Sequence, residues 1–306
     1  MKEFSFICIS YNQQKEIVEH LESIRQLVER FGGNTENDLI VADDGSADGT
    51  AAVAREWIGR NRGLFRRAEV LPETANMGTV RNIYRAIDSC RTENFKILAG
   101  DDKYNLCDIY ALYDSLGDDI VITPVLPFGN FGSMGKKLIE SFRRSYRLTM
   151  AYNKNNNIGE LILFRNYLLA PGVFTPSRYW RDSEARELLH RFRYIEDTPL
   201  WMKLIYERRT PVRFEPVPYI FYRIDAEQML SSQRTAGIRE QDDEEMRRQY
   251  PQRLLDKRKF FRPSFYRFMA VKTFYTFSDR YDGFFKENPE VKRVYYDLIS
   301  SEHQCR

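Results

Sequence analysis

The segment Phe95-Lys96-Ile97-Leu98-Ala99-Gly100-Asp101-Asp102 places two adjacent carboxylates directly after a short apolar run. The run predicts a buried strand, and ligands bind at the carboxyl ends of strands in an open α/β sheet. Two neighbouring carboxylates repel each other unless a cation is present, and Mg²⁺ or Mn²⁺ is held by carboxylates together with substrate phosphates. The pattern therefore predicts a metal–diphosphate site in an exposed loop. A solvated turn is the alternative, because Gly-Asp-Asp also favours turns.

A second pair of acids follows another predicted strand. Residues 38–42 form a mainly apolar run, and Asp43, Asp44 and Gly45 come directly after it. Asp48 is a suitable N-cap for a helix at 51–58. Turn and capping chemistry account for Asp48, but they do not explain two acids ahead of the turn glycine.

Strands and helices alternate through the N-terminal third of the chain. The apolar patterns predict strands at 4–10, 38–42, 69–71 and 95–99, and helices at 16–30, 51–58 and 79–90. This alternation predicts an α/β fold with a mostly parallel sheet and helices on both faces. The loop after the first strand, Ser10-Tyr11-Asn12-Gln13-Gln14, has no glycine, which argues against a nicotinamide dehydrogenase.

Two further acids, Glu196 and Asp197, precede Pro199 and a predicted helix at 201–207. A helix N-terminus favours acidic side chains, so capping is one interpretation. The other is a general base, which we assign to Asp197 with Glu196 as the alternative. A predicted strand at 217–223 ends in Arg223, which could pair with phosphate oxygens or with a nearby acid such as Asp225 or Glu227.

With these residues in order, the chain resembles family 2 of the inverting glycosyltransferases, which have the GT-A fold. The resemblance covers roughly the first 230 residues. It rests on five segments: Ser10-Tyr11-Asn12, Asp43-Asp44-Gly45-Ser46, Asn76-Met77-Gly78 with Arg81-Asn82, Ala99-Gly100-Asp101-Asp102, and Tyr194-Ile195-Glu196-Asp197-Thr198-Pro199-Leu200. Many relatives carry an acid at the position of Ala99.

The resemblance implies a role for each of these segments. Asp102 and Asp101 would bind Mn²⁺ or Mg²⁺, with Asp101 also contacting the ribose, and Asp197 or Glu196 would be the base. The residues implied to bind the nucleotide are Ser10, Tyr11, Asn12, Asp43, Asp44, Asn76, Gly78, Arg81, Asp101 and Arg223.

The resemblance also implies the domain organisation and the reaction. A GT-A domain would occupy residues 1–230, with a nucleotide-binding half at 1–120 and an acceptor half at 121–230, followed by a helical region at 231–306. The expected reaction moves a sugar from a nucleotide-diphosphate donor, a UDP-sugar, to a hydroxyl of a glycan or of a lipid-linked oligosaccharide. The expected setting is the synthesis of a bacterial surface polysaccharide.

The sequence leaves two alternative functions. A sugar nucleotidyltransferase also uses paired acids and a metal, but it would carry a glycine-rich, basic loop after the first strand. A non-catalytic nucleotide-sugar-binding scaffold would differ from the enzyme only in lacking turnover.

The composition of the 306 residues fits a cytoplasmic globular protein. The net charge is only +3, so no nucleic-acid partner is expected. The four cysteines lack CxxC spacing, which predicts free thiols, and the three histidines are scattered. No signal peptide or membrane-spanning run is recognisable.

The C-terminal region is basic and aromatic. Seven Lys or Arg lie between Arg253 and Tyr275, and eleven Phe or Tyr lie between Phe260 and Phe285. Three interpretations fit: a helical cap on the catalytic domain, a contact of 253–285 with the anionic inner face of a membrane, and, least favoured, single-stranded nucleic acid.

Overall fold

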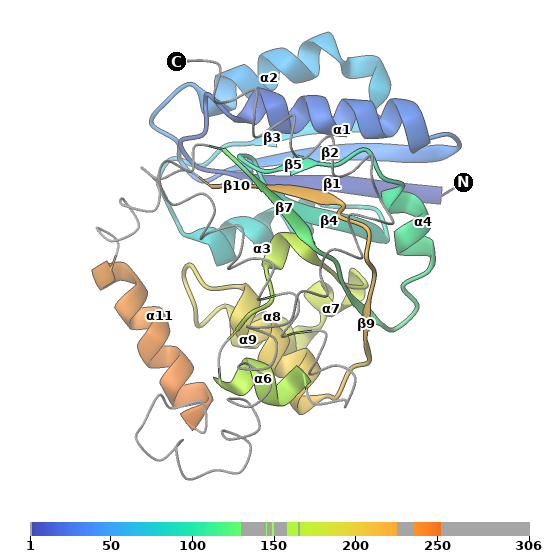
Figure 1. Cartoon of the computed structure of the whole chain (residues 1–306). Coiled ribbons are helices and arrows are strands. Elements are labelled where there is room, and N and C mark those ends of the chain that lie inside the picture. The colour runs from blue at the N-terminus through green and yellow to red at the C-terminus, as the bar shows by residue number, and fades with distance from the viewer. Residues whose placement is uncertain are drawn as a thin grey trace.

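A parallel four-stranded sheet forms the centre of the molecule (Figure 1). The computed structural model describes residues 2–129, 158–164, 166–224 and 236–251, together with residues 145 and 149. The strand order is β3-β2-β1-β4, and β1 pairs in parallel with both β2 and β4. These strands are β1 (Lys2–Ser10), β2 (Thr35–Asp43), β3 (Arg67–Leu71) and β4 (Asn94–Ala99).

Helices cover both faces of this sheet because successive side chains of the central strand point to opposite sides. Phe6 and Cys8 of β1 pack in the core on one face, which is covered by α1 (Ile17–Phe31) and α2 (Thr50–Arg60). Ile7 packs in the core on the other face, which is covered by α3 (Thr79–Ser89), as Figure 1 shows. The carboxyl ends of all four strands therefore open at one edge, between two layers of helices.

Two small three-stranded sheets are built from strands that follow β4 in the sequence. The first has the order β5-β10-β7, with β5 (Lys103–Tyr104), β7 (Val125–Phe128) and β10 (Ile220–Arg223). The second has the order β8-β6-β9, with β6 (Ile120–Ile122), β8 (Val173–Phe174) and β9 (Val212–Phe214). The pairing of β10 with β7 brings Arg223 opposite Phe128.

The remaining helices lie mostly below the central sheet in Figure 1, and α11 stands apart from it at the left. They are α4 (Ile109–Asp114), α6 (Ile158–Phe164), α7 (Arg178–Arg181), α8 (Ser183–Leu189), α9 (Asp197–Trp201) and α11 (Ala236–Gln249), with short 3₁₀ turns at Arg62–Leu64 and Ala170–Gly172 and a π-helical segment at Met202–Glu207.

The predicted α/β class, with its mostly parallel sheet and its helices on both faces, is confirmed. Three local predictions need correction. The helix α2 begins at Thr50 with Gly49 at its N-cap, while the Asp48 carboxylate accepts a hydrogen bond from the Thr50 N–H at 3.0 Å. The strand predicted at 217–223 begins only at Ile220, because Pro218 has no N–H to donate to a ladder. The helix predicted at 201–207 is α9 followed by the π-helical segment.

The C-terminal predictions are largely untested. The basic and aromatic region 253–285 lies outside the described residues, and the boundary at 230 stays a prediction. Within the described part of the chain, no helix combines the length and the apolar character that crossing a bilayer requires.

Candidate active site

Asp102, the second acid after β4, is buried rather than exposed. Only 2% of it is accessible, so the expectation of an exposed loop acid was wrong. The backbone N–H of Arg223 donates to its Oδ1 at 2.8 Å. Behind it, the ring Nδ1 of His20 in α1 lies 2.8 Å from the Asp102 backbone oxygen, which fixes Nδ1 as the protonated nitrogen because a carbonyl only accepts. Neighbouring elements thus hold the acid in place.

The surroundings of Asp102 disfavour its ionised form in the absence of further positive charge. Burial raises the pKa of its carboxyl well above the usual value, and the neighbouring Asp101 raises it further. The N–H and charge of Arg223 and the charge of Lys96 act in the opposite direction without cancelling the rise.

Lys96 in β4 is a buried cation that sequence reasoning missed. It is 4% exposed, its Nζ donates to the Val173 backbone oxygen at 2.8 Å, and it lies 4.2 Å from the centre of the Phe174 ring. Burial lowers its pKa to about 7, although the charge of Asp102 raises it. The position of Lys96 in an otherwise apolar predicted strand is the feature of the sequence that could have identified it.

Arg223 is held by several groups of the protein. Its Nε donates to the Asp101 backbone oxygen at 2.8 Å, and its Nη2 pairs with Glu19 at 2.7 Å. The guanidinium also lies 4.4 Å from the centre of the Phe128 ring. The ion pair is therefore made with Glu19 of α1, whereas Asp225 and Glu227 lie outside the described residues. The remaining N–H groups of the guanidinium are not used in these contacts.

Glu196 and Asp197 lie at the start of α9, as predicted, with Glu196 at the N-cap. The Asp197 carboxylate is oriented by its neighbours: Oδ2 accepts from Asn166 Nδ2 at 2.8 Å, and Oδ1 accepts from the Thr198 hydroxyl at 3.0 Å and from the Thr198 N–H. Asn166, 31 residues earlier, was not identified from the sequence.

One cavity brings Asp102 together with Glu196 and Asp197. It measures about 610 Å³, within the usual range for small-molecule sites, and Asp102, Glu196 and Asp197 line it with Lys96 and Tyr222. Burial raises the pKa of the Tyr222 phenol, and the charges of Asp102, Asp101, Asp197 and Glu196 raise it further, in that order. The two acidic pairs, far apart in sequence, therefore act on the same phenol.

The loops after β1 and β2 are joined by hydrogen bonds. The Asn12 N–H donates to the Ser46 hydroxyl at 2.8 Å, and the Asn12 side chain accepts from the Ala47 N–H at 2.9 Å. Gln14 makes a similar reciprocal pair, accepting from the Gly49 N–H at 2.8 Å and donating its own N–H to Asp48 at 3.1 Å. Tyr11, directly before Asn12, is exposed.

Asp43 and Asp44 connect these loops to the segment before α3. Asp43 accepts from the Ser46 N–H at 3.0 Å and lies 3.4 Å from the Ser10 hydroxyl. Asp44 accepts from the N–H groups of Met77 and Gly78 at 2.8 and 2.9 Å. The first three segments predicted for the nucleotide are thus brought together at the carboxyl edge of the sheet.

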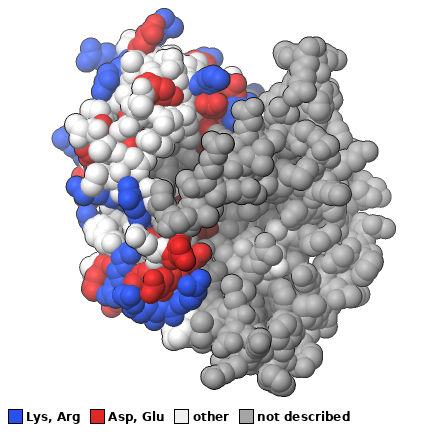
Figure 2. Space-filling model, turned by 90° about the vertical axis from the view of Figure 1, so that its left-hand side faces the viewer, with Lys and Arg blue, Asp and Glu red and all other residues white. Residues whose placement is uncertain are grey.

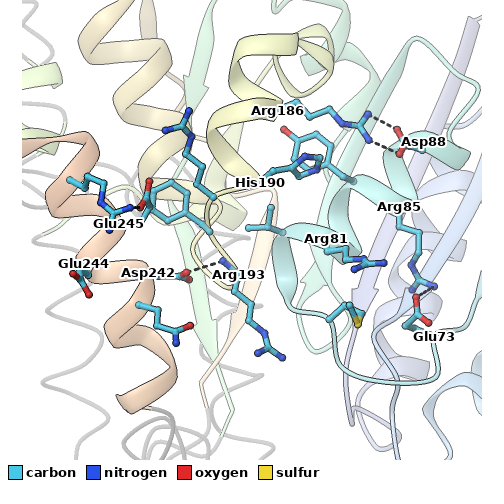
Figure 3. A pocket seen from close by; sticks show the side chains of 17 residues that line it. Glu73, Arg81, Arg85, Asp88, Arg186, His190, Arg193, Asp242, Glu244 and Glu245 are labelled. Atoms are coloured by element: carbon cyan, nitrogen blue, oxygen red, sulfur yellow. Dashed lines mark hydrogen bonds and ion pairs between the residues drawn. The ribbon is translucent and has the colours of Figure 1, made fainter.

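Arg81 and its neighbour Asn82 are placed differently. Asn82 is buried and donates to the Ala42 backbone oxygen at 2.8 Å, which is a structural role. Arg81 lines a second cavity of about 860 Å³ that lies between α3, α8 and α11, and it is absent from the lining of the acidic cavity (Figure 3). In this second cavity Arg186 is paired with Asp88.

The described surface carries no large area of one charge on the face seen in Figure 2, where Lys and Arg are intermixed with Asp and Glu. Among the described residues, no three His, Cys, Asp or Glu side chains form a group that could hold a metal ion by themselves.

The family of the protein follows from comparison with known sequences. The model of glycosyl transferase family 2 matches residues 5–170, which is more than half of the chain. The chain belongs to glycosyl transferase family 2, as the sequence resemblance implied. The match covers β1 to β4 with the segments at Asp43, Asn76 and Asp101, and it ends before Glu196.

Solved structures of S. aureus TarS are similar to this chain. The match to the complex of TarS 1–349 with UDP has 17% sequence identity and a TM-score of 0.47. It covers 78% of this chain and 65% of the TarS chain. The complex with UDP-GlcNAc is 18% identical, with coverages of 76% and 61% and a TM-score of 0.49. The chain thus spans less than two thirds of these proteins. No curated protein matches the chain.

Proposed function

We propose that the protein transfers a glycosyl unit, with inversion, from a UDP-linked sugar to a hydroxyl group of a glycan or of a lipid-linked oligosaccharide. One observation carries the proposal: Asp102, which follows β4, and the two acids that begin α9 line a single cavity and all raise the pKa of the Tyr222 phenol. Glycosyl transfer needs two separate functions of this kind, one at the leaving diphosphate and one at the attacking hydroxyl.

The residues of this chain would divide the work by position. The hydrogen-bonded loops after β1 and β2, with Asp43, Asp44 and the segment at Asn76, would bind the nucleotide at the carboxyl edge of the sheet. The Asp197 carboxylate would accept the proton of the acceptor hydroxyl while the oxygen bonds to the anomeric carbon and the bond to the diphosphate breaks. Asn166 and Thr198 hold this carboxylate in one orientation, and such positioning favours in-line attack.

Asp102 and Asp101 fit a divalent cation. Within the described part of the chain, the second oxygen of Asp102 accepts no hydrogen bond, although the residue is buried and lines the cavity. Two carboxylates with no third acid, His or Cys grouped beside them among the described residues suit Mg²⁺ or Mn²⁺, whose coordination is commonly completed by substrate phosphates and water. When bound, the cation would stabilise negative charge on the departing diphosphate.

The test combines binding with turnover. UDP and UDP-GlcNAc, which are the ligands of the TarS structures, are compared with GDP and ADP by thermal shift, with and without Mn²⁺. We expect selective stabilisation by the uridine compounds that increases with Mn²⁺, since a ligand of the folded state raises its apparent stability. Release of UDP from a UDP-sugar panel then distinguishes an enzyme from a binding scaffold. Stabilisation by no nucleotide would contradict the proposal.

The cytoplasmic location and the membrane contact of region 253–285 stay predictions. Co-sedimentation of the full chain with vesicles containing phosphatidylglycerol, compared with phosphatidylcholine alone, tests the membrane contact. Binding that vanishes at high salt would support it, and equal recovery with both vesicle types would contradict it.

A further inference from the structure

Asp242 of α11 makes an unusual set of contacts with the segment that precedes the acids of α9. Its Oδ1 accepts the N–H of Arg193 at 2.8 Å, and its Oδ2 accepts those of Tyr194 and Ile195 at 2.7 and 3.0 Å. Only 3% of Asp242 is exposed. Figure 3 shows Asp242 on α11 facing Arg193 beside the second cavity. Three successive backbone N–H groups on one carboxylate form an anion-binding nest that the protein fills itself.

The strength of this contact follows from its chemistry. A buried carboxylate is costly unless it is hydrogen-bonded, and three N–H donors compensate for its lost hydration. Bonds to an ionised acceptor are about twice as strong as neutral ones. The conformation of residues 193–195 is therefore fixed from the side of α11.

The same segment is held from the other side by the residues expected to bind the donor. Arg193 Nη2 donates to the Asn76 backbone oxygen at 3.0 Å, and the Tyr194 hydroxyl lies 3.3 Å from the Asn76 side-chain oxygen. The Arg193 backbone oxygen accepts the Val80 N–H at 3.1 Å. Gly78 lies so close that a Cβ there would be 2.5 Å from Arg193 Cγ.

Glu196 follows directly after Ile195, and Asp197 is the next residue. The segment 193–195 thus joins the loop at residues 76–78 to the two acids, and Asp242 sets its conformation. We propose that Asp242 is a positioning residue for the transfer reaction, fixing Glu196 and Asp197 relative to the donor without touching the substrate. This inference rests on the proposed function, in which one of these acids is the base.

The main variant is Asp242→Asn, which keeps the shape but cannot accept all three N–H groups, because its amide nitrogen is a donor. Glu244→Gln is the control, since it makes the same charge change at an exposed position of the same helix. We expect kcat of Asp242→Asn at saturating donor to fall ~10- to 100-fold, the scale expected for a misplacement of catalytic groups by a fraction of an ångström to 1 Å. The donor dissociation constant should change less than about 3-fold, and the control should match wild type.

A double-mutant cycle separates positioning from mere anchoring of α11. If Asp242 acts through the base, Asp242→Asn should cost little further turnover in an Asp197→Asn background, because groups that act as a unit are non-additive. Full additivity, or unchanged kcat in Asp242→Asn, would overturn the inference. The cycle is repeated with Glu196→Gln, and if neither single change at 196 or 197 lowers turnover, the proposed base is wrong instead.

Asp242→Glu guards against a variant that fails to fold. It keeps the charge and the anchoring of α11 but shifts the carboxylate by one methylene, so the segment 193–195 must move. We expect a lower kcat with an unfolding temperature near that of wild type. Wild-type kcat in Asp242→Glu would mean that Asp242 only anchors α11. The same conclusion would follow if kcat fell only in proportion to the folded fraction of the variant.

Discussion

The backbone N–H of Arg223 donates to Oδ1 of Asp102 at 2.8 Å, across a separation of 121 residues. The acid at the end of β4 is thereby oriented by β10, a strand of a different sheet. This relationship decides how the acid should be tested. An alanine at position 102 would leave a buried donor without its acceptor, at about 1–3 kcal/mol, whereas an asparagine keeps an oxygen there.

Asp102→Asn should therefore fold normally and lose metal-dependent binding. Replacing the carboxylate by a neutral amide removes the charged oxygen that a hard cation prefers, so we expect Mn²⁺ affinity in the presence of UDP to fall ~10- to 100-fold or more. Calorimetric titration with UDP and Mn²⁺ measures this, with the exposed Asp114→Asn as control. Unchanged Mn²⁺ dependence in Asp102→Asn would remove this acid from the metal site.

Asp197→Asn keeps the shape of the side chain and removes the proposed proton acceptor. Turnover should fall ~10²- to 10⁴-fold, the usual contribution of general base catalysis, while donor affinity changes little. Steady-state kinetics with donor and acceptor varied separately measures both quantities. The reverse pattern, a crippled Glu196→Gln beside a nearly normal Asp197→Asn, would exchange the roles of the two acids.

Lys96→Met tests the buried cation through its pH dependence. In the unfolded chain the lysine binds its proton up to about pH 10.5, whereas in the folded protein its pKa is lowered to about 7. Between these values the unfolded state binds more protons, so the free energy of unfolding of the wild type should rise with pH relative to Lys96→Met. Below pH 7 the difference between the two proteins should be constant.

The expected rise is on the order of a few kcal/mol, because each unit of pKa difference corresponds to about 1.4 kcal/mol. Urea unfolding at pH 6.5, 8 and 9.5 measures it. Wild-type and variant curves that run parallel over this range would mean that Lys96 keeps its proton in the folded state.

Gly78→Ala tests the close approach between the loop at residues 76–78 and Arg193. Gly78 has φ +98°, which strains any other residue, and an added Cβ would lie 2.6 Å from the Arg193 backbone oxygen. We expect a loss of ~1–3 kcal/mol in unfolding free energy, the usual scale for such strain, with weaker UDP binding. Chemical denaturation measures the stability, and Gly63→Ala, where a Cβ meets nothing within 4 Å, is the control. Equal stability of the two variants would contradict the strained geometry.

What could be predicted from the sequence depended on whether the signal was local. Asp43, Asp101 and Asp197 each follow or begin an element recognisable from its own few residues, so their placement at strand ends and at a helix start was predictable. Asp242 contacts a segment 47 to 49 residues earlier and lies in a strongly charged helix, where one acid resembles the next. Its partners are backbone groups, which leave no mark in the sequence.

Burial was the other property that local patterns could not supply. Asp102 follows the local pattern of a turn residue, yet it is buried and accepts the N–H of Arg223 from β10, which is distant in the sequence. Lys96 is a different case, because a lysine within an apolar strand could have been noted as an anomaly. The short strands β6, β8 and β9 have only two or three residues each, too few for a periodic pattern.

The hydrogen bonds that join the loops after β1 and β2 have a consequence for engineering and for divergence within the family. Asn12 and Gln14 in one loop each make reciprocal bonds with residues 46–49 in the other, so neither loop holds its shape independently of its counterpart. A graft that replaces only one of them would lose several bonds at once. The two loops are therefore a single unit of exchange, and chimaeras intended to alter the preference for the nucleotide base should transplant both together.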